Sequence, residues 1–200
     1  MSNLFTPINL GDVHIKNRFI HSATYEVMSL ETGEVSDKLI KRYQNLAKGE
    51  VGLIITGYMY IHPLGRSAKY QTGIYNDDKI PGLGRLVEAV HQEGGKIAFQ
   101  LAHAGRQTSK ALIGQTPIGP SSKGRDPIYF VKPKEMNADE IDGLIKAFGE
   151  AASRAVKAGA DGIQLHAAHG YLINQFISPF FNQRKDEWGG LFENRRKIAL

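Results

Sequence analysis

Two histidines and a tyrosine lie within six residues of one another, in the segment His166-Ala-Ala-His169-Gly-Tyr171. Imidazole and phenol groups can donate hydrogen bonds and transfer protons, and imidazole also binds metals. The segment directly follows a short apolar run, 162–165, which predicts a buried strand entered from a preceding helix. Titratable and aromatic groups at the carboxyl end of such a strand are typical of an α/β active site.

The spacing of the two histidines leaves their role open. Residues three apart lie on the same side of a helical turn, so His166 and His169 could be metal ligands, core histidines or an anion-binding pair. No third ligand follows nearby in the sequence, and we expect no bound metal.

Apolar periodicity predicts the elements that must position this segment. Residues 8–16 form two short alternating segments around Gly11-Asp12, which predicts a small N-terminal hairpin. Expected strands cover 17–22, 51–56, 96–101 and 162–165, and expected helices cover 38–48, about 81–93, 138–158 and 191–200. Asn137 and Glu140 match a capping box at the start of the third helix. We expect its inward residues to be Ile141, Leu144, Ile145, Phe148, Ala152 and Val156.

Four successive strand–helix units with continuous apolar strands predict a parallel sheet with right-handed crossovers. An open doubly wound sheet and a (β/α)8 barrel both fit. The turn after the first strand, 22–26, lacks the glycines of a nucleotide-binding turn, and polar residues follow all four strands, which favours the barrel. A barrel takes roughly 250 residues or more. We therefore expect an α/β chain in which residues 1–200 are the N-terminal half of a single barrel domain whose C-terminal half is absent from this chain.

Composition narrows the class of protein. The 200 residues include no cysteine, 42% are hydrophobic and the net charge is +5. The basic residues are scattered, so we expect no nucleic-acid partner. No apolar run is long enough for a membrane span and no secretory signal is visible, so we expect no membrane association and a cytoplasmic location.

The long tract from His103 to Met136 is rich in Gly, Pro and Ser, and tracts of this length in a compact domain are usually functional or mobile.

Several motifs together resemble those of the Old Yellow Enzyme family of FMN-dependent NAD(P)H oxidoreductases, and most closely its bacterial ene-reductase and dienoyl-CoA-reductase-like branches. They extend over the whole chain in the right order: Leu4-Phe-Thr-Pro-Ile, Lys16-Asn-Arg, Gly52-Leu-Ile, Gln100-Leu-Ala-His-Ala-Gly-Arg106, His166-Ala-Ala-His-Gly-Tyr-Leu and 182–194. The resemblance implies an eight-stranded barrel with FMN at its carboxyl mouth and NADH or NADPH as reductant. It implies a small-molecule alkene substrate of the α,β-unsaturated carbonyl type.

The resemblance also implies roles for individual residues. His166 and His169 would donate hydrogen bonds to the substrate's carbonyl oxygen, where negative charge develops. Tyr171 would donate a proton to the α-carbon, although it could instead merely pack in the barrel mouth. Gln100 would bind the pyrimidine edge of the flavin, unless it is a satisfied interior amide. Flavin contacts would also come from the loops after the first two strands, at Ser22, Ala23, Thr24, Tyr25, Gly57 and Tyr58, with a plain turn glycine as the alternative for Gly57.

Two positions depart from the family pattern. Tyr25 stands where family members usually carry a Thr or Cys that tunes the flavin, and Val27 stands where one branch places a substrate-contacting Tyr. These departures leave the redox potential and the substrate's shape open.

Other interpretations stay open beside the oxidoreductase. The chain could be a non-catalytic fragment or split half of such a barrel, or, less in keeping with its motifs, a metal-dependent hydrolase on the same barrel. Homo-oligomer formation and an iron–sulfur cluster in a C-terminal extension are left open as well.

Overall fold

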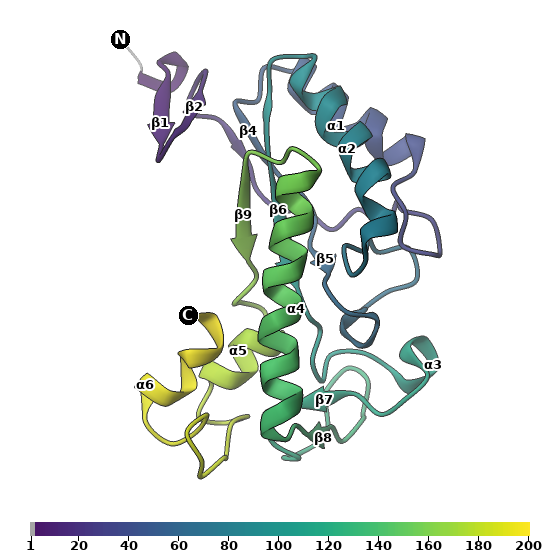
Figure 1. Ribbon diagram of the computed structural model, residues 1–200, viewed down its shortest axis with the longest axis vertical. Helices are drawn as coiled ribbons and strands as arrows, with labels where there is room; N and C mark the ends of the chain where they lie inside the picture. The colour runs from purple at the N-terminus through teal and green to yellow at the C-terminus, as the bar shows by residue number, and fades with distance from the viewer. Residues whose placement is uncertain (1–2) are drawn as a thin grey trace.

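A parallel sheet with three helices against one face forms the centre of the structure (Figure 1). The computed structural model describes residues 3–200. The sheet comprises β3 (Ile20–His21), β4 (Leu53–Ile55), β5 (Met59–Tyr60), β6 (Lys96–Ala102) and β9 (Gly162–Leu165). The helices against it are α1 (Asp37–Lys48), α2 (Ile80–His91) and α4 (Ala138–Lys157). All pairings in this sheet are parallel, as the continuous apolar runs predict.

The strand that pairs with β6 on one side is interrupted near the carboxyl edge of the sheet, which divides it into β4 and β5. β4 and β5 both pair with β6 on the same side, with Ile55 opposite Ala98 and Met59 opposite Leu101. Three residues, 56–58, therefore oppose two residues of β6, as in a β-bulge. The Thr56 hydroxyl accepts a hydrogen bond from the Gln100 N–H at 3.2 Å and so continues the ladder across the interruption.

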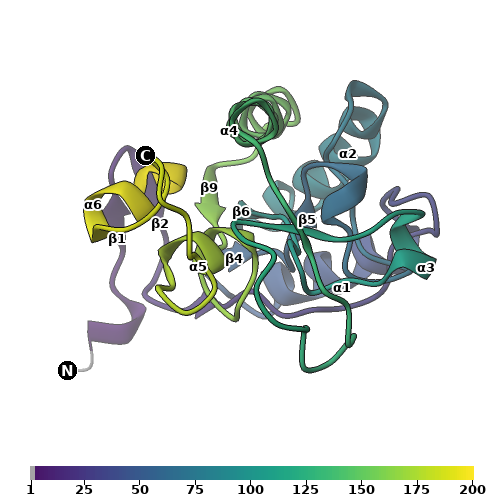
Figure 2. The same ribbon diagram turned by 90° about the horizontal axis from the view of Figure 1, so that it is seen from below.

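The central strand separates two environments by its alternating side chains. Ile97, Phe99 and Leu101 of β6 are fully buried in the large apolar core beneath the helices. Ala98 points to the opposite face and packs with Ile15. Figure 2 shows α2 and α4 on the same side of the strands. The face away from the helices is therefore the one on which Gln100, two residues after Ala98, can meet a ligand.

The N-terminal hairpin is confirmed and lies at the amino ends of the strands (Figure 1). Its strands are β1 (Ile8–Leu10) and β2 (Val13–Ile15), and Gly11 takes the positive φ of 57° that the turn needs. Ile15 is buried against Leu53 and Ala98 and so covers this end of the sheet.

The start of helix α4 agrees with the prediction from the sequence. The Asn137 side chain accepts from the Glu140 N–H at 2.8 Å while Glu140 accepts from the Asn137 N–H at 2.9 Å, which confirms the capping box. The predicted inward orientation is wrong for two residues of α4, because Ile145 is 37% and Val156 is 69% exposed. The predicted inward residues Ile141, Leu144 and Phe148 are buried. The buried stripe continues through Ala151 and Ala155, because these positions share the face turned to the sheet.

The carboxyl-terminal part differs from the expectation in three ways. β9 is not buried, with Ile163 40% and Leu165 42% exposed, because only β6 pairs with it among the described residues. The expected helix over 191–200 is a short α6 (Phe192–Arg195) followed by the 3₁₀ turn η4 (Lys197–Ala199). An unexpected helix, α5 (Leu172–Ile177), directly follows Tyr171.

The tract 103–136 contains short elements instead of being wholly irregular. They are α3 (Lys110–Ile113), β7 (Ile118–Gly119) and β8 (Lys134–Glu135), with β7 and β8 paired in parallel. Three further 3₁₀ turns lie elsewhere, η1 (Asn3–Phe5), η2 (Pro63–Gly65) and η3 (Asp77–Lys79). Within residues 3–200, none of the helices has both the length and the apolar character of a membrane span.

Candidate active site

Four rings from three different loops meet at the carboxyl edge of the sheet. Tyr58 stacks on Tyr25 with ring centroids 5.0 Å apart, and it lies 5.7 Å from His166 and 5.2 Å from Tyr171. His166 and Tyr171 are 4.9 Å apart, edge to face. We call these four residues the aromatic cluster. The structure thus brings together residues that follow β3, β4 and β9.

The two histidines are adjacent, but not because they share a helical turn. They lie in the loop between β9 and α5, where His169 takes a left-handed φ of 56°. His169 Nδ1 is 3.4 Å from His166 Nε2, and the rings are nearly perpendicular. His166 Nδ1 accepts from the Ala168 N–H at 3.4 Å, so its proton lies on Nε2, the atom that faces His169.

His166 is a neutral hydrogen-bond donor at neutral pH. Its side chain is buried, and this burial, with the neighbouring His169, lowers its pKa to about 4. A neutral N–H suits the stabilisation of an oxygen that gains negative charge during a reaction, because its orientation is fixed beforehand.

Two amide side chains fix the loop that carries the histidines. Gln107 donates to the His169 carbonyl at 2.8 Å, and the fully buried Gln175 donates to the Gly170 carbonyl at 2.6 Å. Gln175 also accepts from the Arg106 N–H, so α5 is tied to the segment after β6. Our sequence interpretation missed both amides. The signal for Gln175 is the pair of amide residues, Asn174 and Gln175, inside the otherwise apolar run of α5.

Tyr171 is half-buried and its hydroxyl donates to the Tyr58 hydroxyl at 3.0 Å. Burial and then the neighbouring Tyr58 raise the pKa of Tyr171 well above its ordinary value. The phenol therefore stays protonated through the physiological range, as a proton donor must.

Gln100 lies on the sheet face away from the helices and is 8% exposed. Its Nε2 donates to Gln164 Oε1 of β9 at 2.6 Å, a partner that the sequence interpretation also missed. Its own Oε1 accepts no hydrogen bond within residues 3–200. The amide is oriented by Gln164 and keeps an acceptor for a further polar group.

The loops after β3 and β4 touch at Gly57. A Cβ added to Gly57 would lie 2.6 Å from the Thr24 carbonyl oxygen, so only glycine allows this approach. Ser22 and Thr24 are exposed beside it, Ala23 is partly exposed, and Tyr25 is 39% exposed. The exposed residues 22–25, the stacked pair of Tyr25 and Tyr58 and the oriented Gln100 amide fit a planar ring with a polar edge, which is the chemistry of an isoalloxazine. No group of three metal-ligating side chains occurs in the described part of the chain.

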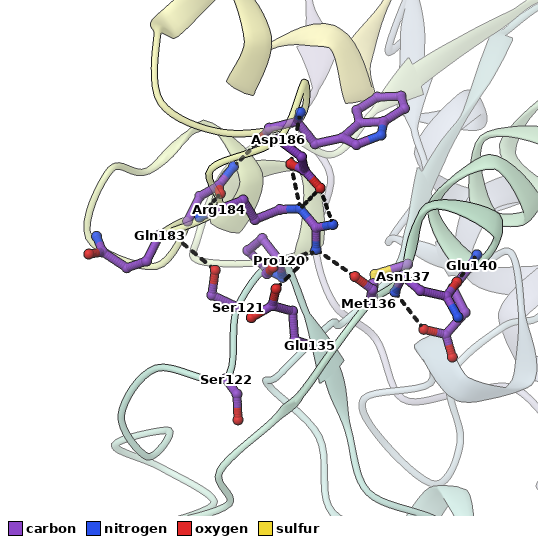
Figure 3. Close-up of polar contacts among 12 residues, drawn as sticks. Pro120, Ser121, Ser122, Glu135, Met136, Asn137, Glu140, Gln183, Arg184 and Asp186 are labelled. Atoms are coloured by element: carbon purple, nitrogen blue, oxygen red, sulfur yellow. Dashed lines mark hydrogen bonds and ion pairs between the residues drawn. The ribbon is translucent and has the colours of Figure 1, made fainter.

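Arg184 fixes the long tract beside this site (Figure 3). Its guanidinium donates to the Pro120 carbonyl at 3.0 Å and to the Met136 carbonyl, and it pairs with Asp186. The side chain is 6% exposed. The burial of this side chain rules out a plain surface role for Arg184.

Parallel strands with their polar residues at the carboxyl edge define this chain as part of an α/β barrel protein. The chain belongs to the NADH:flavin oxidoreductase / NADH oxidase family, which it matches over residues 3–200. It is 42% identical over 196 residues to an NADPH dehydrogenase of Bacillus subtilis, covering 98% of this chain and 57% of the relative. It is 41% identical over 202 residues to an NADH oxidase of Thermoanaerobacter brockii, covering 99% and 31%.

Solved structures agree with this assignment. Morphinone reductase in complex with tetrahydroNAD superimposes with a TM-score of 0.92 at 32% identity, over 100% of this chain and 58% of that chain. The Old Yellow Enzyme homologue from Zymomonas mobilis gives 0.92 at 32% identity, over 99% and 57%. A 2-naphthoyl-CoA reductase complex gives 0.94 at 31% identity, over 98% and 32%. The expected fold class, the N-terminal half of a (β/α)8 barrel, is confirmed, and the chain spans between about a third and three fifths of these proteins.

Proposed function

We propose that the protein is an FMN-dependent NAD(P)H oxidoreductase that reduces the C=C bond of an electron-poor alkene, such as an α,β-unsaturated carbonyl compound. In this proposal residues 1–200 supply the N-terminal portion of one FMN-binding barrel domain. The observation that carries the proposal is the aromatic cluster: a neutral imidazole N–H and a phenol O–H lie side by side, next to the oriented amide of Gln100.

Each group of residues would have a separate role in the reaction. Gln100 would bind the polar edge of the flavin, and the backbone and side chains of 22–25 and 57–58 would line its ring. Bound FMN, reduced by NADH or NADPH, would supply the hydride for the β-carbon. His166 and His169 would hold the carbonyl oxygen by their N–H groups and stabilise the charge that develops there. Tyr171 would give its proton to the α-carbon.

The test is the Tyr171→Phe variant of the full-length protein. We expect the flavin content and the rate of flavin reduction by NADPH to match the wild type. Reoxidation by 2-cyclohexen-1-one should slow by about 10²- to 10⁴-fold, the usual contribution of a general acid. Released chromophore other than FMN would overturn the cofactor assignment, and unchanged reoxidation would overturn the role of Tyr171.

A further inference from the structure

The Tyr58 hydroxyl lies at the centre of a chain of hydroxyl groups. Its oxygen accepts from the Tyr171 hydroxyl at 3.0 Å and from the Ser67 hydroxyl at 3.2 Å. A phenol oxygen has two lone pairs and one hydrogen. When both of these hydroxyls donate to Tyr58, the hydrogen of Tyr58 is left for a third partner.

Tyr58 is held in this position by buried groups. Gln71, which is 2% exposed, donates to the Tyr58 carbonyl at 3.1 Å and accepts from the Ser67 N–H at 2.8 Å. The same Gln71 oxygen lies 3.1 Å from the Ser67 hydroxyl, whose one hydrogen goes either to Gln71 or to Tyr58. The ring of Tyr25 stacks on the other side of Tyr58. The β-bulge at 56–58 redirects this residue away from the ladder of β6 and toward Tyr171, which is 113 positions later in the sequence.

This arrangement also bears on the departure at Val27. Val27, 44% exposed in the loop after β3, stands where one branch of the family places a substrate-contacting tyrosine. The phenol that is hydrogen-bonded to Tyr171 comes instead from Tyr58 in the loop after β4. The site therefore holds a pair of hydrogen-bonded phenols instead of one.

A pair of phenols matters for proton donation from a buried site. When Tyr171 gives up its proton, the oxygen left behind carries a negative charge in surroundings that solvate charge poorly. A hydroxyl 3.0 Å away can turn and donate to that oxygen without any movement of the backbone. Ser67 then offers the next oxygen in the direction away from Tyr171.

We propose that Tyr58 and Tyr171 act as one proton-delivery unit, in which Tyr58 stabilises the Tyr171 phenolate and returns a proton to it. The inference rests on the proposed function. The enolate formed by hydride transfer from reduced flavin uses its electron pair to form the new bond between the α-carbon and hydrogen, as the O–H bond of Tyr171 breaks. The Tyr58 proton then moves to the Tyr171 oxygen, and Tyr58 is reprotonated from solvent by way of Ser67.

The experiment compares Tyr58→Phe, Tyr171→Phe and the double variant in the full-length flavoprotein, with 2-cyclohexen-1-one as the probe. Phenylalanine keeps the ring that would line the flavin, so rates are normalised to bound flavin, and we expect Tyr58→Phe to slow reoxidation about 10- to 100-fold, the effect of one lost hydrogen bond to a charged group. The double variant should be no slower than Tyr171→Phe alone, because the two phenols act in one step. The solvent deuterium isotope effect on reoxidation should change in Tyr58→Phe, which a merely structural role would not cause.

Two controls keep the outcomes separate. Tyr70→Phe removes an exposed phenol outside the aromatic cluster and should behave as wild type. Ser67→Ala leaves the Tyr58 hydroxyl in place and should slow reoxidation less than Tyr58→Phe does. Unchanged reoxidation in Tyr58→Phe, or effects of the single variants that multiply in the double variant, would overturn the inference alone. A wild-type flavoprotein that fails to reduce the enone would overturn the proposed function and the inference with it.

Discussion

The carboxylate of Glu26 occupies the space that a side chain at position 57 would need. A Cβ on Gly57 would lie 2.2 Å from Glu26 Oε2. The Tyr43 hydroxyl accepts from the Gly57 N–H at 2.9 Å and donates to Glu26 Oε1, so helix α1 holds both loops together. The Glu26 side chain is 7% exposed, and burial raises the pKa of its carboxyl.

Gly57→Ala should therefore disturb the loops that line the site. The added methyl group meets both a buried carboxylate and the Thr24 carbonyl, and overpacking of this kind costs about 1–3 kcal/mol. We expect a lower free energy of unfolding in urea and less bound flavin per protein, measured by absorbance. Gly149→Ala in α4 is the matched control, since nothing lies within 4 Å of its added Cβ. It should raise stability by about 1 kcal/mol, and an equal effect of the two substitutions would contradict this account.

His103 should make the protein sensitive to acid. It is 1% exposed, its Nδ1 accepts from the Gly105 N–H at 3.0 Å, and burial, followed by the nearby His62, lowers its pKa to about 3. The unfolded chain binds a proton below about pH 6.5 while the folded chain does not. The effect of His103 on the free energy of unfolding should be constant above pH 6.5. As the pH falls from 6.5 to 3, His103 should lower the free energy of unfolding by up to roughly 1.4 kcal/mol per pH unit.

The check is urea unfolding between pH 4 and 7 in wild type and His103→Gln. Glutamine keeps an acceptor for Gly105 but does not titrate, so the slope should shrink. Part of it should remain, because His166 has its pKa lowered to about 4 and titrates in the same window. An unaltered slope in His103→Gln would rule out this residue as the source.

Arg184→Lys should loosen the long tract. A lysine carries one ammonium group and cannot reach the Pro120 and Met136 carbonyls and the Asp186 carboxylate together. We expect a loss of about 2–4 kcal/mol, since buried partners are left unpaired. Limited proteolysis should then cut within 121–135. Lys185→Ala, at an exposed neighbour, should leave the cleavage pattern unchanged, and protection equal to wild type in Arg184→Lys would argue against this role of Arg184.

Val27→Asn should stabilise the loop after β3. Val27 has a φ of 53°, a left-handed conformation that is strained for a β-branched residue by roughly 1–2 kcal/mol and that asparagine tolerates. Its side chain is 44% exposed, so little packing is lost. We expect a higher midpoint of thermal unfolding. Val156→Asn, at an exposed position with helical φ in α4, should give no such gain, and a loss of stability in Val27→Asn would show that the strain is offset by contacts of the valine.

Much of the fold could be predicted from local patterns. The apolar runs of β4 and β6, the capping box at Asn137 and the turn at Gly11 are each decided by residues within a few positions of one another. The motif positions of the site could also be named from the resemblance, and their roles stay predictions. The exposure of β9 could not be predicted, because it depends on which strands flank it and not on its own apolar sequence.

The alternation of strands with helices and the polar groups after the strands can be predicted from the sequence, because hydrophobic periods and helix caps act over one or two turns. The contacts of Tyr58 with Tyr171, of Gln100 with Gln164 and of Arg184 with Met136 arise only when the chain is folded. Each of these pairs joins residues at least 48 positions apart. Their meeting depends on strand register and on the bulge at 56–58, which no local pattern of the sequence contains.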